Sequence, residues 1–361
     1  PQYKQVHTRM TNNPELSIIL VSYNTKDYTI RALESVYQQT SATSFEIIVV
    51  DNESSDGSLD AIKKAFPQAK CYPSGGNIGF AGGVQFGVAR ASGHLILLLN
   101  PDTLVTDKAI DKLIEFSKKT PQNGIWGGVT LNEDLSINTQ HAWARHDFAS
   151  LLFSALGISK IFKKSCFFNK NNYGCWDRLS VKEVDILSGC FFLTTKQLWD
   201  EIGGLDPSFF MYAEEADYCF KAKKLGYQPI ISPDARIIHH GGISHSHFSG
   251  KMIKLLRGKV ELILRHDTNI MKPIYIRLLY LYVVNKLVST TLRYLDERIQ
   301  IMAVTKKILA VSSSGGHWIQ LLRLRHDVFD RHHTVYVGTN DGMRSLLRDD
   351  EFFYKVQDCN L

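Results

Sequence analysis

Three carboxylic acids fall within four positions of the chain, at Glu214, Glu215 and Asp217. They follow an aromatic run at 209–212 (FFMY) and precede a segment with helical spacing. Carboxylates this close repel one another, which raises the pKa of at least one and leaves a proton acceptor near neutral pH. A solvated helix N-terminus accounts for the same cluster, because the helix dipole stabilises negative charge there. The rest of the chain must decide between a general base and a plain helix terminus.

A second group of polar residues follows apolar runs that have the composition of buried strands, at 16–22, 45–50 and 94–99. The residues in this group are Tyr23, Asn24, Asp51, Asn100 and Asp102. Segments with helical spacing at 26–39 and 59–66 alternate with the runs, which predicts a doubly wound α/β sheet. Such sheets bind ligands at the carboxyl ends of their strands, where the polar group falls.

Two further features suit a phosphorylated ligand at that edge. A single hard carboxylate such as Asp102 suits Mg²⁺ or Mn²⁺, which share their oxygen ligands with diphosphates, although Asp102 could equally cap a helix. The glycine-rich stretch 75–87 (GGNIGFAGGVQFG) leads into a helical segment whose amides could face a phosphate. It matches neither the dinucleotide fingerprint nor the P-loop, and tight packing of a helix on the sheet explains its glycines as well.

Together these motifs resemble the family 2 glycosyltransferases with a GT-A fold, most closely the bacterial rhamnosyltransferase-like branch. The matching segments are VSYN (21–24), VVDNESSDGS (49–58), GGNIGFAGG (75–83), LLLNPDT (97–103), VDILSGCFFL (184–193), GGLDPSFFMYAEEADYC (203–219) and HHGGIS (239–244). They occur in the order of the family and cover about residues 16–245. The resemblance implies a GT-A nucleotide-diphospho-sugar transferase fold with a doubly wound mixed sheet.

The resemblance also implies a role for each matching residue. Glu215 is expected to be the base, although the family typically has Asp there, with Glu214 and Asp217 as its catalytic neighbours. Asp102 and His239, with His240 as the fallback, are expected to bind Mg²⁺ or Mn²⁺. The nucleotide-sugar is expected to contact Ser22, Tyr23, Asn24, Asp51, Asn77, Gly79, Phe80 and Asn100. The acceptor is expected at Ser188 and Gly189.

The implied activity is metal-dependent transfer of a hexosyl or rhamnosyl group from a UDP- or dTDP-linked donor to a hydroxyl of a lipid-linked or polysaccharide acceptor. One base on the face opposite the leaving group gives direct displacement with inversion. Cell-surface polysaccharide synthesis is the expected setting. A catalytically inactive membrane scaffold that recruits a partner glycosyltransferase is the alternative, and the intact set of Asp102, Glu215 and His239 argues against it. A nucleotidyltransferase would need a basic, glycine-rich loop after Tyr23, which the sequence lacks.

The stretch 126–178, rich in Phe, Asn, Lys and Trp, is interpreted as an acceptor-binding excursion. Trp143 and Trp176 could stack on a sugar there, although ordinary packing of large aromatics explains either one at least as well. The six cysteines form no CxxC pair or zinc spacing, and the chain opens polar and basic without a signal peptide. These features predict a cytoplasmic protein with reduced thiols.

The charge of the chain predicts where it meets a membrane. The chain has a net charge of +6. Residues 251–300 contain ten Lys and Arg and four Asp and Glu, so this segment accounts for the whole net charge. A basic segment with Leu, Ile and Tyr favours an anionic membrane surface over nucleic acid, for which the chain shows no motif. Its most apolar run, 276–288, is shorter than the roughly 20 residues of a bilayer span. We therefore expect peripheral binding at the inner face of the plasma membrane.

Three regions are predicted: a GT-A catalytic domain at 15–250, a basic amphipathic helical segment at 251–304, and a partial GT-B-like, Rossmann-like α/β unit at 305–361. The last contains SSSGGHWIQLLRL at 312–324, which resembles the start of the membrane-associating subunit of lipid-linked N-acetylglucosaminyltransferases. That resemblance implies a partner glycosyltransferase subunit and no complete active site in this unit.

Overall fold

The computed structural model describes residues 14–241, 248–267, 270–303, 307–311, 333–338 and 352–355. The chain divides into two compact units, residues 1–285 and 286–361. In the second unit, three parallel strands form a sheet in the order β13-β14-β15. They are β13 (Lys307–Val311), β14 (His333–Gly338) and β15 (Phe352–Lys355). The Ser/Gly turn and helix expected after β13 lie outside the described residues.

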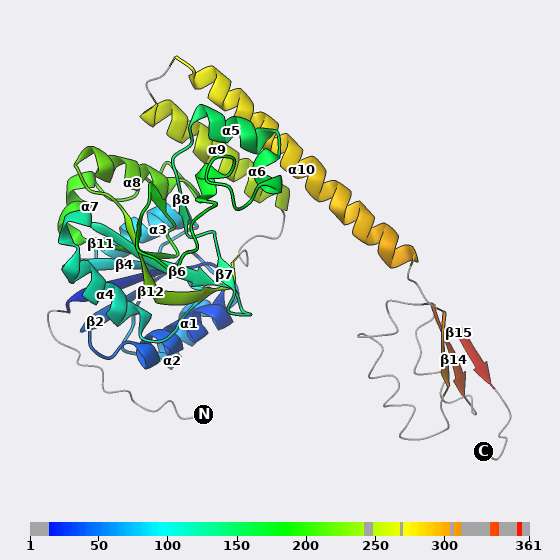
Figure 1. The fold of residues 1–361 in the computed structure, drawn as a ribbon. Helices are drawn as coiled ribbons and strands as arrows, with labels where there is room; N and C mark the ends of the chain where they lie inside the picture. Colours follow the sequence, from blue (N-terminus) through cyan, green and yellow to red (C-terminus); the bar gives the residue numbers. More distant parts are fainter. Residues whose placement is uncertain are drawn as a thin grey trace. The chain divides into compact units, whose positions relative to one another are not determined.

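A mixed sheet forms the centre of the first unit, and within the described residues it contains ten strands (Figure 1). Its order is β3-β2-β1-β4-β11-β6-β12-β5, with β7 beside β6 and β9 beside β12. The strands are β1 (Leu16–Ser22), β2 (Phe45–Asp51), β3 (Lys70–Pro73), β4 (Leu95–Leu99), β5 (Thr103–Val105), β6 (Ile125–Leu131), β7 (Ile137–Asn138), β9 (Lys182–Glu183), β11 (Phe191–Thr195) and β12 (Ile230–His239). Strands β1 to β4 pair in parallel, whereas β11 runs antiparallel to both β4 and β6. The predicted α/β sheet is confirmed.

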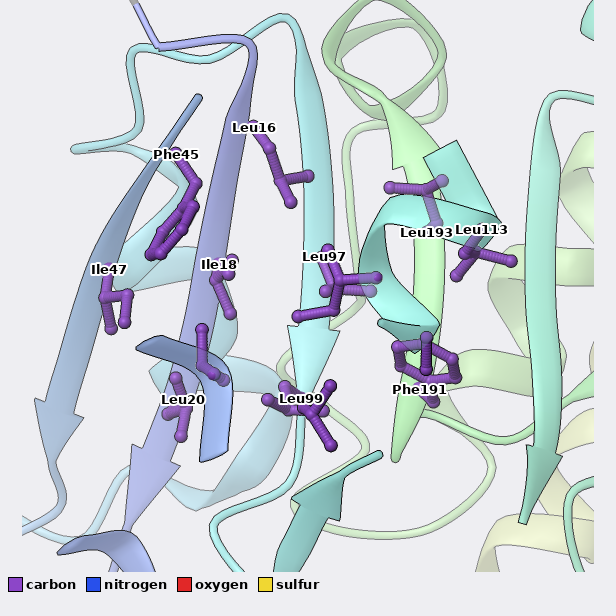
Figure 2. Close-up of a cluster of buried hydrophobic side chains, with 14 of the residues drawn as sticks. Leu16, Ile18, Leu20, Phe45, Ile47, Leu97, Leu99, Leu113, Phe191 and Leu193 are labelled. Carbon is purple, nitrogen blue, oxygen red and sulfur yellow. The ribbon is translucent and has the colours of Figure 1, made fainter. Parts of the chain in front are cut away.

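The central strands are apolar along their whole length because both faces of the sheet are covered. Every residue of β1 is buried, with Leu16, Ile18 and Leu20 in one core cluster and Ile19 and Val21 in the other. Side chains of a strand alternate between faces, so this division follows from the pleat. Figure 2 shows the first cluster.

Helices cover each face. Those with buried residues in the first cluster are α1 (Lys26–Gln39), α2 (Ser58–Ala65) and α4 (Ala109–Lys119). Those with buried residues in the second are α3 (Gly79–Val88), α7 (Lys196–Ile202) and α8 (Glu214–Lys224). The glycines at positions 83 and 87 let α3 approach the sheet, since a Cβ at either would lie 2.7 Å from Val21 or Ile19. Packing of a helix on the sheet, one of the two explanations of the glycine-rich stretch, therefore accounts for these two residues.

A helical layer lies beside the sheet and includes the later part of the stretch 126–178. The predicted start of this excursion is wrong, because residues 126–131 belong to β6, a buried strand of the central sheet. It contains α5 (Phe148–Ala155), α6 (Ile158–Ile161), α9 (Phe248–His266) and the start of α10 (Lys272–Ala303), with 3-10 turns η1 (Pro121–Asn123) and η2 (Lys170–Asn172) elsewhere in the unit. Leu151 of α5, Ile263 of α9 and Leu279 of α10 share a buried cluster. A two-stranded sheet, β8 (Ala142–Trp143) with β10 (Ile186–Leu187), closes the base of the excursion. No described helix is both long and apolar enough to span a bilayer.

One prediction about the cysteines is wrong. Cys166 and Cys175 form a disulfide, with their Cα atoms 5.0 Å apart, while Cys71, Cys190 and Cys219 are free thiols. Cys359 lies outside the described residues. The pairing depends on how the loop folds back on itself through η2, which spacing in the sequence does not reveal.

The packing of β6 on its neighbours yields a stability test. A Cβ at Gly128 would overlap the carbonyl oxygen of Ala235 and the ring of Phe191. We expect Gly128→Ala to lower the free energy of unfolding by about 1–3 kcal/mol, the usual cost of overpacking. Gly250→Ala in α9, where nothing lies within 4 Å of the new Cβ, should be neutral or stabilising. Urea unfolding measures both, and equal stability of the two variants would contradict the packing.

Candidate active site

The turn after β4 brings Asp102 and His239 together. The chain leaves β4 at Leu99, turns through Asn100 and Asp102, and re-enters the sheet as β5, where Thr103 is the register partner of His239. The Thr103 hydroxyl donates to the carbonyl of Asn100 over 2.7 Å and holds the turn. As a result, Nε2 of His239 lies 3.3 Å from Oδ1 of Asp102. The side-chain nitrogen Nδ2 of Asn100 lies 3.5 Å from the same ring nitrogen. The pairing expected of Asp102 and His239 is present in the structure.

The fallback ligand His240 faces elsewhere. Its Nδ1 contacts Oε1 of Glu133 at 2.5 Å, and its ring lies edge-on to Tyr28, with centroids 5.6 Å apart. Among the residues that the structure describes, no third His, Cys, Asp or Glu joins Asp102 and His239 to form a metal cluster.

The start of β11 links this turn to the acids of α8. The amide of Asn100 donates to the carbonyl of Cys190 over 3.2 Å, and the amide of Gly189 donates to the carboxylate of Glu215. Burial raises the pKa of the Cys190 thiol to about 12. The negative charges of Asp102 and Glu215 add to this rise. Asp102 and Glu215 thus both lie in the surroundings of Cys190.

The two glutamates at the start of α8 are suited to hold a proton. Glu214 is only 3% exposed. This burial raises the pKa of Glu214 well above 4.5, and the negative charge of Glu215 raises that pKa further. Burial also raises the pKa of Glu215, opposed by its own amide and by the amides of Gly189 and Ala213. Oε2 of each glutamate is buried without a hydrogen-bond partner. As a whole residue Glu215 is partly exposed, whereas Glu214 is buried.

Asp217 points away from this pair. Its Oδ1 lies 2.7 Å from Nε2 of His266 in α9, and its Oδ2 lies 2.7 Å from Nζ of Lys221. Burial raises the pKa of Asp217, but the bonds from His266 and Lys221 outweigh that effect and lower it. Asp217 thus remains an anion that fastens α9 to α8, which agrees with a holding role and not with proton transfer.

The chain turns sharply just before the acids. Tyr212 and Ala213 have φ values of +72° and +80°, a region that residues with a side chain rarely occupy. Gly258 of α9 packs against this turn, since a Cβ there would lie 2.7 Å from the carbonyl oxygen of Tyr212. The turn that presents Glu214 and Glu215 is therefore supported from outside by α9.

On the nucleotide side, Tyr23 and Asp51 offer groups to a ligand. Tyr23 is 40% exposed at the end of β1. Asp51 is buried, with Oδ2 accepting from the Ser54 amide over 3.0 Å and Oδ1 without a partner. A buried carboxylate oxygen without a partner at the carboxyl end of a strand suits the N–H of a base or the hydroxyl of a ribose.

Ser22 and Asn24 hold the loop itself. The hydroxyl of Ser22 is buried 3.1 Å from that of Thr25 and 3.2 Å from that of Thr29. Oδ1 of Asn24 accepts from the amide of Ser55 over 2.7 Å, which ties the end of β1 to the loop after β2. Their side chains shape the nucleotide-facing loops and are already engaged within the protein.

The glycine-rich stretch meets the aromatic run before α8. At Gly79, φ is +76° and a Cβ would overlap the carbonyl oxygen of Phe210, to which the amide of Phe80 donates over 2.9 Å. Nδ2 of Asn52 donates to the carbonyl of Gly79 over 2.9 Å. The backbone amide of Gly79 donates to Oδ1 of Asn77 over 3.2 Å. Contact with Phe210 and the positive φ thus both require glycine at position 79, and the contact with a nucleotide-sugar expected of Gly79 stays a prediction.

Asn52 was not among the residues singled out in the sequence, although it stands in the polar run 49–58. It is buried, and its side chain joins the loop after β2 to the start of α3.

The acceptor-side residues fall into two groups. Gly189 is buried against the ring of Phe80, and the amide of Ser188 donates to the carbonyl of His141 over 2.9 Å, so both lie beside Glu215. Trp143 is half-buried in β8. Trp176 is only 9% exposed, and its indole donates to the carbonyl of Ser180 over 3.2 Å, which favours ordinary packing over sugar stacking.

Comparison with known proteins agrees with this arrangement. The family described as "Glycosyl transferase family 2" matches residues 17–216. The N-acetylglucosaminyl-diphospho-decaprenol L-rhamnosyltransferase of Mycobacterium tuberculosis is 24% identical over 241 residues, 62% of this chain and 76% of the relative. Rhamnosyltransferase WbbL of Escherichia coli is 26% identical over 247 residues, covering 66% and 88% of the two chains.

Two more relatives extend the comparison. The low-salt glycan biosynthesis hexosyltransferase Agl10 of Haloferax volcanii is 26% identical over 214 residues, 58% of this chain and 62% of the relative. Among solved structures, the mannosyltransferase PcManGT of Pyrobaculum calidifontis, in complex with GDP-Man and Mn²⁺, superposes with a TM-score of 0.49 at 16% identity. That superposition covers 78% of this chain and 76% of the other.

The buried glutamates predict a pH effect on stability. A carboxyl group with a raised pKa binds more protons in the folded chain than in the unfolded chain, so the free energy of unfolding falls as pH rises above about 4.5. Glu214→Gln removes this group, and we expect the variant to lose less stability than the parent between pH 4.5 and neutrality. Urea unfolding across this range measures it. Glu201→Gln, at an exposed position of α7, should follow the parent, and the same slope for Glu214→Gln would contradict the prediction.

Proposed function

The chain belongs to glycosyl transferase family 2, and from this premise we propose an inverting, metal-dependent transfer of a hexosyl or rhamnosyl group. The donor is a nucleoside-diphosphate sugar, UDP- or dTDP-linked, and the acceptor is a hydroxyl of a lipid-linked or polysaccharide molecule. Membership of the family establishes sugar transfer on a mixed α/β sheet of the GT-A class. Inversion, the metal and the acceptor are the parts that we propose.

One observation supports the proposal most directly: Glu215 and the turn that carries Asp102 are both tied to neighbouring residues of one short segment, Gly189 and Cys190. Glu215 accepts from Gly189, and Asn100, two residues before Asp102, donates to Cys190. A sugar held between them would have its leaving diphosphate toward Asp102 and its acceptor toward Glu215. This separation of one base from one leaving-group site is what a single displacement needs.

In this proposal Glu215 takes the proton of the acceptor hydroxyl as the oxygen attacks the anomeric carbon. The new bond joins that carbon to the acceptor oxygen, and the bond to the diphosphate oxygen breaks with its electron pair leaving on the diphosphate. The raised pKa of Glu215 makes the carboxylate a better proton acceptor, and the amide of Gly189 orients it. Attack opposite the leaving group inverts the anomeric carbon.

The residues beside the leaving group fit Mg²⁺ or Mn²⁺. Asp102 and His239 supply one carboxylate oxygen and one imidazole nitrogen within 3.3 Å of each other, and such ions take their remaining ligands from phosphate oxygens and water. A bound divalent cation would stabilise the charge that grows on the leaving diphosphate. Asp51, with its unpartnered oxygen, and the exposed ring of Tyr23 would hold the nucleoside.

The relatives support the acceptor class. One is by its name a rhamnosyltransferase acting on N-acetylglucosaminyl-diphospho-decaprenol, a lipid-linked sugar. We propose that this chain also acts on a lipid-linked acceptor in cell-surface glycan synthesis, as a peripheral protein at the inner face of the plasma membrane. Recruitment of a partner glycosyltransferase through the second unit is a further part of the proposal.

An inactive scaffold is disfavoured by the energetics of α8. Buried carboxyl groups without partners destabilise a fold, and Glu214 and Glu215 each keep a buried oxygen without one. A protein that only recruits a partner gains nothing from such groups, whereas a base needs them.

The first test concerns the base. Glu215→Gln keeps size and hydrogen bonding but removes the proton acceptor, so we expect turnover to fall by roughly 10²–10⁴-fold with little change in donor affinity. Initial rates and donor titrations measure both, and an NMR spectrum of the product gives its anomeric configuration. Glu201→Gln should keep full activity. If Glu214→Gln were inactive and Glu215→Gln active, the base would be Glu214 and our assignment would be wrong. A product that retains the configuration of the anomeric carbon would contradict a single displacement.

The second test concerns the metal ligand. We expect Asp102→Asn to weaken donor binding and to leave residual activity nearly insensitive to added Mn²⁺, because the carboxylate oxygen is lost. Activity and donor affinity are titrated against Mn²⁺ and Mg²⁺. Asp107→Asn, at an exposed aspartate of the next turn, is the matched control and should behave like the parent. Full metal-dependent activity in Asp102→Asn would show that Asp102 only shapes the turn.

A further inference from the structure

The loop around α6 exposes large apolar side chains. We call residues 156–168 the α6 loop. Leu156, Ile161, Phe162 and Phe167 are 56%, 75%, 49% and 66% exposed. Isolated apolar residues on a surface are ordinary, but several in one short loop mark a surface that something else covers.

These side chains are held outward by an ordered loop. Ring contacts join Phe162, Phe167 and Phe168 to one another and to Phe153 of α5, with centroids 4.9–5.4 Å apart. Nδ2 of Asn169 donates to the carbonyl of Lys163 over 2.7 Å, and the disulfide between Cys166 and Cys175 closes the loop. The aromatic cluster is thus internally packed and still presents one side to the solvent.

The charge of the loop is of one sign. Between residues 148 and 176 there is no Asp or Glu, while Lys160, Lys163, Lys164 and Lys170 all fall there. The first three are exposed within the α6 loop, and Lys170 pairs with Asp147. Exposed aromatic and aliphatic side chains interleaved with lysines alone are complementary to a lipid surface with anionic head groups.

The start of α10 continues this surface. Nδ2 of Asn285 donates to the carbonyl of Ala155 over 2.6 Å, which brings α10 next to Leu156. On α10, Tyr280, Leu281 and Val284 are 54%, 41% and 52% exposed. In Figure 1, α5, α6 and α10 lie together on the side of the unit where α9 also packs.

The α6 loop belongs to the acceptor side of the site. The excursion that carries it leaves the sheet region at β8 and returns at β10, and these strands pair through Trp143 and Ile186. β10 runs directly into Ser188 and Gly189, beside Glu215. A lipid surface under the loop would therefore meet the protein at the side where the acceptor is expected.

We propose that the α6 loop, with the outer face of α10 up to Asn285, docks on an anionic lipid bilayer and presents the site to a lipid-linked acceptor. Docking itself depends only on the surface described here, whereas its purpose rests on the proposed function. The proposal centres the membrane contact on a loop far earlier in the chain and keeps only the start of α10 from the basic segment 251–300. Ile161, Phe162 and Phe167 insert among the head groups, and the lysines contact the lipid phosphates.

The test uses the full chain and sedimentation with vesicles of phosphatidylcholine alone or of equal parts phosphatidylcholine and phosphatidylglycerol. We expect the parent to bind the anionic vesicles more tightly, with binding that weakens as salt rises. The triple variant Ile161→Ser, Phe162→Ser, Phe167→Ser should bind about a hundredfold more weakly. The variant Lys160→Gln, Lys163→Gln, Lys164→Gln should lose most of the preference for anionic lipid, about fivefold for each lysine at low salt.

Matched controls separate the loop from other surfaces. Leu135→Ser and Leu225→Ser change exposed apolar residues elsewhere, 64% and 46% exposed, and should bind like the parent. Lys254→Gln with Arg257→Gln removes two exposed cations of α9 and should have a smaller effect than the lysine variant. Because the triple variant removes part of an aromatic cluster, Ile161→Ser alone, outside that cluster, is measured beside it and should still weaken binding about tenfold.

The outcomes distinguish the proposals. Parent-like vesicle binding by Ile161→Ser and the triple variant would overturn the docking surface, as would loss of binding in the α9 variant alone. The parent could instead bind no vesicles and form dimers that are lost in Ile161→Ser. This result would identify the face as a protein interface and would overturn the proposal. Donor hydrolysis without acceptor is followed in every variant. Vesicle binding that depends on the loop, in a chain that transfers no sugar, would support the surface and count against the proposed function.

Discussion

The antiparallel pairing of β11 with β4 is the constraint on which the site depends. In a parallel sheet only the carboxyl ends of strands reach the ligand-binding edge. β11 runs the other way, so its beginning meets the end of β4, with Phe191 opposite Leu99. That register places Cys190 beside Asn100 and connects the turn that carries Asp102 to Glu215 through Gly189. The second antiparallel pairing, of β5 with β12, adds His239 to the same edge.

The acids of α8 are held at this edge at an energetic cost that the surrounding packing offsets. Burial of Glu214 and Glu215 disfavours their charged forms, and the turn before them has two left-handed residues that are not glycine. Three contacts support the turn from different directions: Phe210 against Gly79, Gly258 of α9 against Tyr212, and His266 of α9 against Asp217. The glycine-rich loop and α9 therefore both stabilise the position of Glu215, the proposed base.

Local pattern predicted the elements well and the contacts poorly, for a physical reason. The run LSIILVS and the helix at 26–39 have the bounds expected of them. Both signals are local, because an unbroken apolar run indicates a strand buried on both faces and apolar residues at helical spacing indicate a helix. The bond between Asp217 and His266 joins residues 49 positions apart, and nothing near either residue indicates it. The Cys166–Cys175 disulfide and the burial of Trp176 likewise depend on how the excursion folds back. For Asp102 and His239 the family resemblance, and not local pattern, supplied the pairing.

The role of α9 illustrates how tertiary contacts change the meaning of a sequence pattern. Its basic, amphipathic sequence favoured a membrane surface, yet several of its apolar side chains are buried within the first unit. Leu262 is buried with Phe209 and Phe220, and Ile263 is buried with Leu151. Two other apolar side chains of α9, Ile253 and Leu264, are 49% and 50% exposed, so only part of its apolar surface is left for lipid. The α6 loop, by contrast, gathers Leu156, Ile161, Phe162 and Phe167 as exposed side chains within one short stretch, and we therefore propose it, with the outer face of α10, as the hydrophobic part of the membrane contact.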